Sequence, residues 1–237
     1  SGCYAARFDA SGPTIIDHHT GLEWEKKDGE DGSADSSNPH DVDNRYTWTA
    51  SGSPYPPTGT AFTDFLPKLN GASSDGVTLT GCFAGHCDWR LPTIKELYSL
   101  ILFSGTDPDP NGRSTAGLKP FIDNSVFKFQ YGKAEDGDRI IDSQFATSTL
   151  YVSTTMGGNK TMFGVNFPDG RIKGYPVQGP RNKKYYVLYV RENPNYGKNQ
   201  FKDNGDGTVT DEATGLTWMK NDSGKGLDWL QALAYAG

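Results

Sequence analysis

The feature that most constrains how this 237-residue chain can fold is a short segment that occurs twice. Residues 14–26 read TIIDHHTGLEWEK, and residues 208–220 read TVTDEATGLTWMK. Seven of the thirteen positions are identical, and a tryptophan is among them. Identity of this extent favours an internal duplication. The alternative is that two unrelated hairpins share the same turn chemistry, since glycine-centred turns are common.

Each copy of the segment is predicted to form a β-hairpin. In the second copy, Asn204-Gly205-Asp206-Gly207 is a strong turn signal directly before the strand-forming residues 208–210. Thr214-Gly215 then turns the chain into a second strand at residues 216–218. The same Thr-Gly-Leu-x-Trp pattern at residues 20–24 predicts the same turn in the first copy.

Two helices are predicted after the first copy, and the first of them has a counterpart after the second copy. Apolar side chains within residues 62–69 have the i, i+3, i+4, i+7 spacing of one helical face. The second helix begins at Thr93, which forms a capping box with Glu96. Residues 227–234 start an equivalent of the first helix. We therefore expect a complete domain over residues 1–195 and the start of a second, truncated repeat over residues 196–237.

The rest of the first domain is predicted to combine long loops with strands. Residues 27–60 are rich in Asp, Gly, Ser and Pro and are predicted to be a polar surface loop. Residues 104–143 form another loop-rich tract. Strands are predicted at residues 161–167, 171–175 and 185–191. A hairpin, two helices, long loops and several antiparallel strands indicate an α+β fold.

The charge balance narrows the classes of partner. Asp and Glu outnumber Lys and Arg by 29 to 23, which gives a net charge of −6. Nucleic-acid-binding domains carry a basic stripe, and helices that lie on anionic membranes carry a basic face. The sequence has neither feature, so we expect no nucleic-acid partner. No apolar run approaches the roughly 18 residues that a spanning helix needs, so we expect no membrane insertion.

The cysteines bear on the compartment of the protein. Cys82 and Cys87 are separated by four residues in a glycine-containing stretch, and we expect a short disulfide loop. A disulfide implies an extracytoplasmic location, that is, the periplasm, the cell surface or the medium. The competing interpretation is a metal site with His86, although one His and two Cys leave a zinc ion short of ligands. Cys3 is a candidate for lipid attachment.

Three stretches are distinctive enough to indicate a family: DWRLPTIKEL at residues 88–97, FGVNFPDGR at 163–171 and YVLYVR at 186–191. Together with the Thr-Gly-Leu-x-Trp hairpin, they resemble the Lcl C-terminal domain family, a bacterial domain found at the end of a collagen-like adhesin. The resemblance covers residues 8–192 and resumes at residues 201–237. It implies a secreted or surface-attached adhesion module. The adhesin member binds sulfated polysaccharides, and the acidic composition of this chain departs from that basic binding surface.

Residues 90–93 (RLPT) also resemble the Arg-Leu-Pro-Thr turn of the formylglycine-generating sulfatase modifiers. Those proteins have a C-type-lectin-like fold, which the resemblance therefore implies for this chain. Their chemistry uses cysteine, so an enzyme of this type would need Cys82 or Cys87 as a free, activated thiol. Because these cysteines are expected to be bonded, and because the sequence has no Gly-x-Ser-x-Gly elbow, we expect a non-enzymatic protein. An enzyme of the formylglycine-generating type is the alternative.

Calcium is the one cofactor that the sequence suggests. Asp107, Asp109 and Asn111 alternate in the stretch DPDPNG, which fits the first half of a calcium-binding loop. The twelfth position of such a loop would be Leu118 rather than Glu, so an EF-hand is excluded. The alternative is a polar turn made rigid by its prolines, because half of a motif is weak evidence.

The function that we expect is binding of a glycan or a surface protein. Binding residues tend to lie in loops on a rigid scaffold, which favours residues 104–143 and 147–160. The candidate ligand contacts in these loops are Tyr131, Asp138, Arg139, Tyr151 and Asn159. The excess of acidic residues predicts a neutral or weakly charged glycan rather than a highly sulfated one. A purely structural repeat of a larger surface protein, an oligomer and further copies of the repeat stay open.

Overall fold

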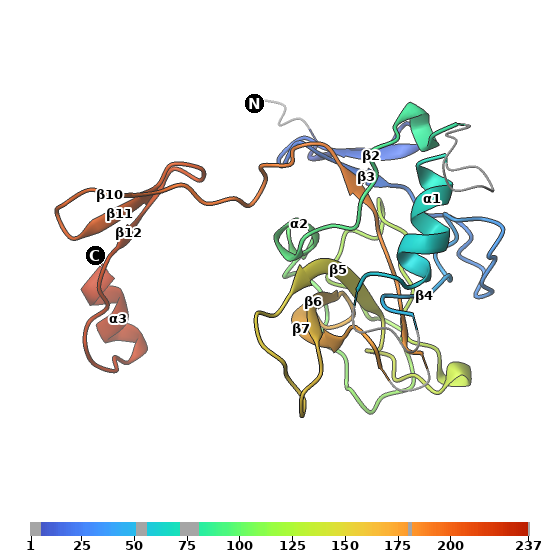
Figure 1. Ribbon diagram of the computed structural model, residues 1–237. Coiled ribbons are helices and arrows are strands. Elements are labelled where there is room, and N and C mark those ends of the chain that lie inside the picture. The colour runs from blue at the N-terminus through green and yellow to red at the C-terminus, as the bar shows by residue number, and fades with distance from the viewer. Residues whose placement is uncertain (1–5, 51–55, 72–80, 180–181, 237) are drawn as a thin grey trace. The chain divides into compact units, whose positions relative to one another are not determined.

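The computed structural model describes residues 6–50, 56–71, 81–179 and 182–236 (Figure 1). The chain divides into two compact units, residues 1–194 and residues 195–237. Antiparallel sheets and a few short helices make up the first unit, so the predicted α+β class is correct.

The first sheet of the first unit contains the first copy of the duplicated hairpin. Its strands, in spatial order, are β1 (Phe8–Asp9), β2 (Thr14–Asp17), β3 (Leu22–Glu25) and β9 (Val190–Arg191). At the turn between β2 and β3, Gly21 has a φ of +70°, a left-handed conformation that glycine adopts without strain. The hairpin is therefore as predicted, and β9 adds a strand from the far end of the unit to its edge.

The other strands of the first unit form two smaller sheets. One is antiparallel and contains β5 (Gln144–Leu150), β6 (Thr161–Asn166) and β7 (Arg171–Pro176); the other pairs β4 (Tyr46–Thr47) with β8 (Lys184–Tyr185). The prediction of one continuous strand over residues 185–191 is wrong, because residues 186–189 link β8 in one sheet to β9 in another. This link is paired on the way: the Tyr186 N–H donates to the Gln144 carbonyl oxygen over 2.9 Å.

The helices of the first unit are short. Within the described residues they are η1 (Ala61–Phe65), α1 (Leu66–Leu69), η2 (Phe83–Gly85), α2 (Ile94–Tyr98) and η3 (Ala134–Asp136). The consecutive η1 and α1 form the first predicted helix. The predicted capping box is present at the start of α2, where the Thr93 hydroxyl accepts from the Glu96 N–H and the Glu96 carboxylate accepts from the Thr93 N–H.

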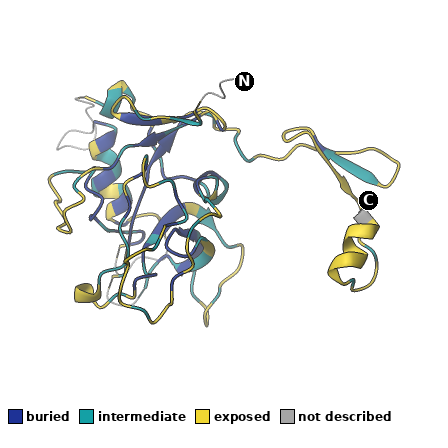
Figure 2. Cartoon of the chain, turned by 180° about the vertical axis from the view of Figure 1, so that it is seen from behind, coloured by how far each residue is buried: buried dark blue, intermediate teal, exposed yellow. Residues whose placement is uncertain are grey.

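Aromatic side chains fill the core of the first unit, whose buried strands are dark blue in Figure 2. Trp24, Phe65 and Tyr189 have no exposed surface. The Phe65 ring lies 4.8 Å from the Tyr46 ring and 4.7 Å from the Tyr189 ring, between centroids. Aromatic pairs at such distances contribute beyond the area that they bury, so this core depends on ring geometry as well as on apolar area.

The described part of residues 27–60 is not the simple surface loop that its composition predicts. Lys27, Val42, Tyr46 and Trp48 in this segment are buried. The Trp48 indole N–H donates to the Thr147 carbonyl oxygen over 3.0 Å, which joins the segment to β5. The prediction fails because polar residues outnumber the aromatic ones in this segment, whereas the large aromatic side chains decide what is buried.

The second unit repeats the hairpin of the first. Its elements are β10 (Phe201–Asp203), β11 (Thr208–Asp211), β12 (Leu216–Met219) and α3 (Trp229–Ala236). Trp218 lies opposite Val209 across the hairpin, as Trp24 lies opposite Ile15 in the first unit. The hairpin and the helix predicted after residue 196 are therefore both present.

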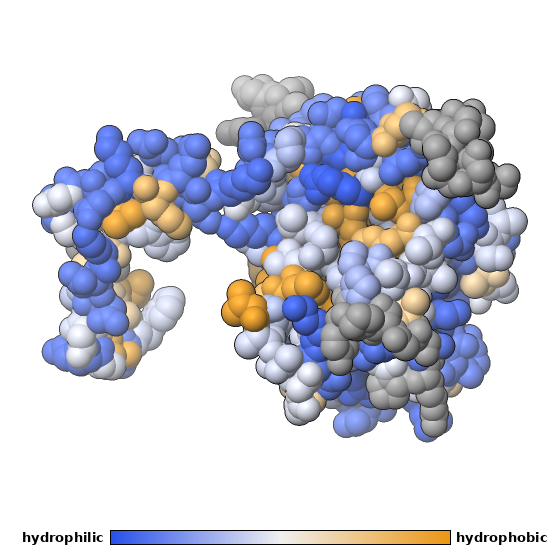
Figure 3. Space-filling model, viewed as in Figure 1, coloured by the Kyte–Doolittle hydropathy of each residue, from blue (hydrophilic) through white to orange (hydrophobic). Residues whose placement is uncertain are grey.

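Large apolar side chains lie at the surface of the second unit, where Figure 3 shows orange side chains over the β10–β12 sheet. Phe201 and Trp218 of the sheet are 66% and 56% exposed, and Trp229 and Leu230 of α3 are 76% and 75% exposed. The equivalent Trp24 has no exposed surface. The same hairpin is thus part of a core in one unit and uncovered in the other.

Asp17, at the end of β2, is a buried carboxylate held by Arg7. The Arg7 guanidinium donates from Nε over 3.0 Å and from Nη2 over 2.7 Å. Burial by itself would raise the pKa of Asp17, but hydrogen bonds from Arg7 and Thr20 outweigh burial and hold that pKa below its usual 3.8. A carboxyl group with a lowered pKa stabilises the folded state above its unfolded pKa, and the stabilisation is lost as the pH falls through the folded pKa.

We expect Arg7→Ala to lower the free energy of unfolding by about 1–3 kcal/mol at neutral pH. The difference from wild type should shrink toward zero below about pH 4, where Asp17 of the unfolded chain is protonated. Urea unfolding across this pH range measures it, with Arg113→Ala as the control because Arg113 is exposed. A difference that does not change with pH would instead assign the effect to the hydrogen bond from Arg7 to the Ser99 carbonyl oxygen.

Candidate functional site

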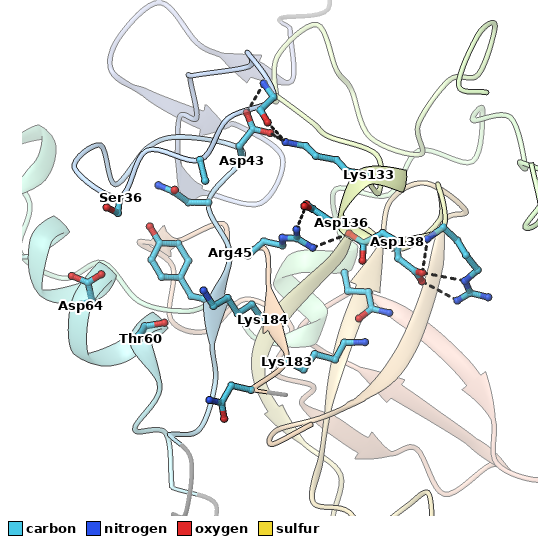
Figure 4. A pocket seen from close by; sticks show the side chains of 18 residues that line it. Ser36, Asp43, Arg45, Thr60, Asp64, Lys133, Asp136, Asp138, Lys183 and Lys184 are labelled. Carbon is cyan, nitrogen blue, oxygen red and sulfur yellow. Dashed lines mark hydrogen bonds and ion pairs between the residues drawn. The ribbon is translucent and has the colours of Figure 1, made fainter. Parts of the chain in front are cut away.

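The first unit contains a polar cleft with a volume of about 920 Å³ (Figure 4). Strands β4 and β8 contribute to it, together with residues 32–36, the start of η1, the segment around η3 and the start of β5. The described residues that line the cleft are Gly32, Ala34, Ser36, Asp43, Asn44, Arg45, Tyr46, Thr60, Asp64, Lys133, Asp136, Asp138, Arg139, Asp142, Gln144, Asn182, Lys183 and Lys184.

Arg45, next to β4, reaches across the cleft to the segment around η3 (Figure 4). Its Nη1 donates to Asp138 over 2.8 Å, and its Nη2 donates to Asp136. The guanidinium also lies over the Tyr186 ring, 5.7 Å from its centroid. One cation thereby holds two carboxylates in place, and each carboxylate keeps lone pairs with which it can accept hydrogen bonds from a ligand.

Two further ion pairs fix the walls of the cleft. Lys133 donates from Nζ to the buried Asp43 carboxylate over 2.5 Å and to the Gly32 carbonyl oxygen over 2.6 Å. Arg139 donates to Asp142 from Nε over 3.1 Å and from Nη2 over 2.8 Å. Burial would raise the pKa of Asp142, but the hydrogen bonds from Arg139 hold that pKa below its usual value. Asp142 is therefore ionised at neutral pH.

Lys183 and Lys184 are the cations of the cleft that a ligand can reach. Among the described residues, neither takes part in an ion pair, whereas Arg45, Lys133 and Arg139 each do. Lys183 is half-buried, and this burial lowers its pKa, although Asp142 and Asp138 partly oppose the shift. Lys184 is exposed.

The lining of the cleft is polar and its charge is balanced. Five cationic and five anionic side chains line it, so their formal charges cancel. Tyr46 is the one aromatic residue among the described lining residues, and it is only 7% exposed. The cleft therefore offers many hydrogen-bond donors and acceptors, fixed in place by ion pairs, and little aromatic surface on which a sugar ring could stack.

The structure brings two of the five predicted ligand contacts together at this cleft, Asp138 and Arg139. The other three lie elsewhere. The Tyr151 ring stacks on Phe163 at 3.9 Å, and the Asn159 amide donates to the Met156 carbonyl oxygen over 2.8 Å. The Tyr131 hydroxyl is buried. Residues 147–150 of the second predicted binding loop belong to β5, so the loop begins after Leu150.

Lys183 and Lys184 also stand out in the sequence as a local basic patch, whereas sequence reasoning missed the cleft residues Arg45 and Lys133. Arg45 lies in the segment that composition predicts to be a solvated loop, and its partners are 91 and 93 positions away. No local spacing links such residues. The one available signal is the pair Tyr46 and Trp48, whose aromatic side chains indicate that the backbone next to Arg45 packs against the domain.

The residues of the predicted calcium site are engaged with protein groups. Asp107 pairs with the Arg171 guanidinium over 3.0 Å, and the Asp109 carboxylate accepts from the Asn111 N–H over 2.9 Å. In the described part of the chain, no cluster of three or more His, Cys, Asp or Glu side chains could hold a metal ion. Calcium binding at Asp107, Asp109 and Asn111 stays a prediction.

The disulfide between Cys82 and Cys87 is present, with the two Cα atoms 5.1 Å apart. It closes the loop that contains Phe83, and the Phe83 carbonyl oxygen accepts from the Trp89 indole N–H over 3.1 Å. Trp89 is 2% exposed and belongs to the hydrophobic core. Cys3 lies outside the described residues.

Comparison with known families decides the relationship that the distinctive stretches suggest. The family model of the Lcl C-terminal domain matches residues 13–191, about three quarters of the chain. This chain belongs to the Lcl C-terminal domain family. The matched part of the Lcl C-terminal domain runs from β2 to β9 and includes every described lining residue of the cleft. No curated protein and no solved structure matches the chain. None of the helices within the described residues is long and apolar enough to cross a membrane.

Proposed function

We propose that the Lcl C-terminal domain of this chain is an extracytoplasmic adhesion module that binds a neutral or weakly charged glycan in the cleft around Arg45. The observation that carries the proposal is the arrangement of fixed ion pairs that line this cleft. Sugar hydroxyls both donate and accept hydrogen bonds, so a rigid lining of carboxylates, amides and ammonium groups complements them. Pre-positioned groups also lose less conformational entropy when they bind.

The charge of the cleft supports a ligand of low charge. A polyanion is bound by clustered Lys and Arg that neutralise it, and here five carboxylates equal in number the five positive charges of the lining. The net charge of the whole chain, −6, also opposes a polyanion. Because Lys183 and Lys184 take part in no ion pair among the described residues, they can bind one acidic group on an otherwise neutral sugar chain.

The proposal extends to fold and location. We propose that the arrangement of short helices, antiparallel strands and long loops is C-type-lectin-like, and that the protein acts at the cell surface or in the medium. The disulfide between Cys82 and Cys87 supports an oxidising compartment. An enzyme of the formylglycine-generating type would require a free thiol at one of these positions, so titration of thiols in the native protein distinguishes the two functions.

A glycan array tests the proposed function, run on the full chain with and without millimolar calcium. We expect binding to neutral or singly charged glycans. Asp138→Asn and Lys184→Ala should each weaken the binding by about tenfold or more, since a hydrogen bond to a charged group contributes roughly 1.5–3 kcal/mol. Lys119→Ala is the matched control, because Lys119 is exposed and lies with Asp138 in the loop-rich tract of residues 104–143 but does not line the cleft.

Two results of the array would contradict the proposal. Equal loss of binding in Lys119→Ala and Lys184→Ala would show that the glycan does not bind specifically in the cleft. Preference for highly sulfated glycans, with retention on heparin above physiological salt, would show that the local lysines outweigh the balanced charge. If glycan binding requires calcium at the predicted site, the double variant Asp107→Ala with Asp109→Ala should abolish glycan binding even when calcium is present.

A further inference from the structure

The β10–β12 sheet of the second unit reproduces the β1–β3 part of the first sheet strand by strand. Leu216 of β12 lies opposite Asp211, as Leu22 of β3 lies opposite Asp17. The turn glycines have the same conformation, with φ of +72° at Gly215 and +70° at Gly21. The first unit therefore shows what a complete form of this sheet contains.

In the first unit, the outer edge of β3 is covered by β9. Trp24 lies opposite Val190, Glu23 lies opposite Arg191, and the Glu25 N–H donates to the Tyr189 carbonyl oxygen over 2.9 Å. Apolar and charged residues alternate in β9, so that Val190 lies on the buried face beside Trp24 while Arg191 pairs with Glu23 on the other face. As a result, Leu22 is only 1% exposed and Trp24 has no exposed surface.

In the second unit, β12 is an edge strand among the described residues, since the sheet order is β10-β11-β12. Leu216 and Trp218 on the face equivalent to the core are 53% and 56% exposed. A largely apolar hollow of about 350 Å³ is lined in part by Phe201, Leu216 and Trp218. An edge strand with unpaired backbone groups and an apolar face is a template for a further strand.

The first unit also shows what fills the equivalent hollow. There the Phe127 ring lies edge-on to Phe8 at 5.2 Å and to Trp24 at 6.5 Å. Phe8 and Trp24 occupy the positions of Phe201 and Trp218 in the second unit. The uncovered surface of the second unit thus corresponds to one that β9 and an aromatic side chain cover in the first.

We propose that β12 is an acceptor for the closing strand of a domain of this family. The occupant is an extended segment of the β9 type, antiparallel to β12, with an aliphatic residue opposite Trp218 and a polar residue opposite Thr217. Main-chain hydrogen bonds to the strand edge provide affinity, and the pocket for the alternate side chain provides specificity. The proposal is independent of the cleft, because it concerns the second unit alone.

Amide hydrogen exchange on the full chain tests the proposal, with a synthetic peptide of residues 184–194 as the donor strand. The Met219 N–H is the reporter, because it is equivalent to the Glu25 N–H, which donates to the Tyr189 carbonyl oxygen next to β9 in the first unit. We expect the peptide to slow exchange at Met219 saturably, by about tenfold or more. Trp218→Ala should weaken the effect roughly thirtyfold, as for a buried aromatic anchor, and Thr217→Ala on the opposite face should leave it unchanged.

A peptide with Val190→Asp is the second test, because it leaves the protein unaltered. It should fail to protect Met219. Equal protection by this peptide or by a scrambled one would overturn the proposal, and so would no protection by the native peptide. If the Met219 N–H exchanges slowly without peptide, and its rate does not depend on protein concentration, the chain already covers its own edge. If its protection instead increases with protein concentration, a second copy of the chain covers the edge.

Discussion

Replacing Trp24 with alanine is expected to lower the free energy of unfolding of the first unit by about 3–5 kcal/mol, as large-to-small changes of buried aromatic residues do. Trp24 has no exposed surface, lies opposite Val190 of β9 and contacts the Phe127 ring edge-on. Its removal therefore opens a cavity at the place where the last strand of the domain joins the first hairpin. The duplication supplies a matched control, because Trp218 occupies the same position in the second unit and is 56% exposed.

Trp218→Ala should change the same free energy by less than about 0.5 kcal/mol, as surface substitutions usually do. Guanidinium unfolding of both variants, followed by near-ultraviolet circular dichroism, makes the comparison. Trp24→Phe should destabilise the first unit less than Trp24→Ala does. The Trp24 indole N–H has no hydrogen-bond partner among the described residues, so phenylalanine loses buried volume but no hydrogen bond. Equal destabilisation by the two alanine variants would contradict the contrast between a complete and an uncovered hairpin.

Glu25→Ala is expected to destabilise the first unit by a similar amount, about 3–5 kcal/mol, because it leaves a buried cation without its partner. Glu25 has no exposed surface and accepts from Lys27 Nζ over 2.8 Å, while Lys27 itself is only 6% exposed. The Lys27 ammonium also lies 4.4 Å from the centroid of the Phe65 ring. The second oxygen of Glu25 accepts from the Tyr189 N–H over 3.1 Å, so the backbone next to β9 loses a hydrogen bond as well.

The double variant Glu25→Leu with Lys27→Met separates these contributions. Replacing both members of a buried ion pair by apolar residues is often neutral, whereas removing one member is costly. We expect the double variant to be more stable than Glu25→Ala and less stable than wild type by about 1–3 kcal/mol. This cost comes from the unsatisfied Tyr189 N–H and from the lost 3.0 Å contact between His40 Nδ1 and the Glu25 carboxylate. Urea unfolding at neutral pH measures all three proteins. A double variant less stable than Glu25→Ala would show that the pair itself is a net source of stability.

Local sequence signals predicted the local structure well. The capping box at Thr93 and Glu96 needs only two residues three positions apart, and the Thr-Gly turn of the hairpin needs a left-handed glycine at Gly21. Both are decided within one turn of chain, so pattern alone finds them. The family, too, follows from stretches that are distinctive by themselves.

Contacts between distant segments explain what the sequence did not predict. Residues 185–191 have the pattern of one strand, but their two ends pair with β4 and β3, which lie far earlier in the chain. The cleft depends on Arg45 meeting Asp136 and Asp138 across more than ninety positions. Only Asp138 and Arg139 of the predicted contacts lie there, since loop position indicates where binding residues gather but not which loops meet.

The measurement that tests glycan binding at the cleft most directly is amide chemical-shift mapping of the full chain with the tightest-binding glycan of the array. Binding in the cleft predicts shifts that cluster in residues 133–144 and 182–184, the segments that line its ion-paired walls. Shifts confined to residues 104–119, or to the second unit, would contradict the cleft as the binding site.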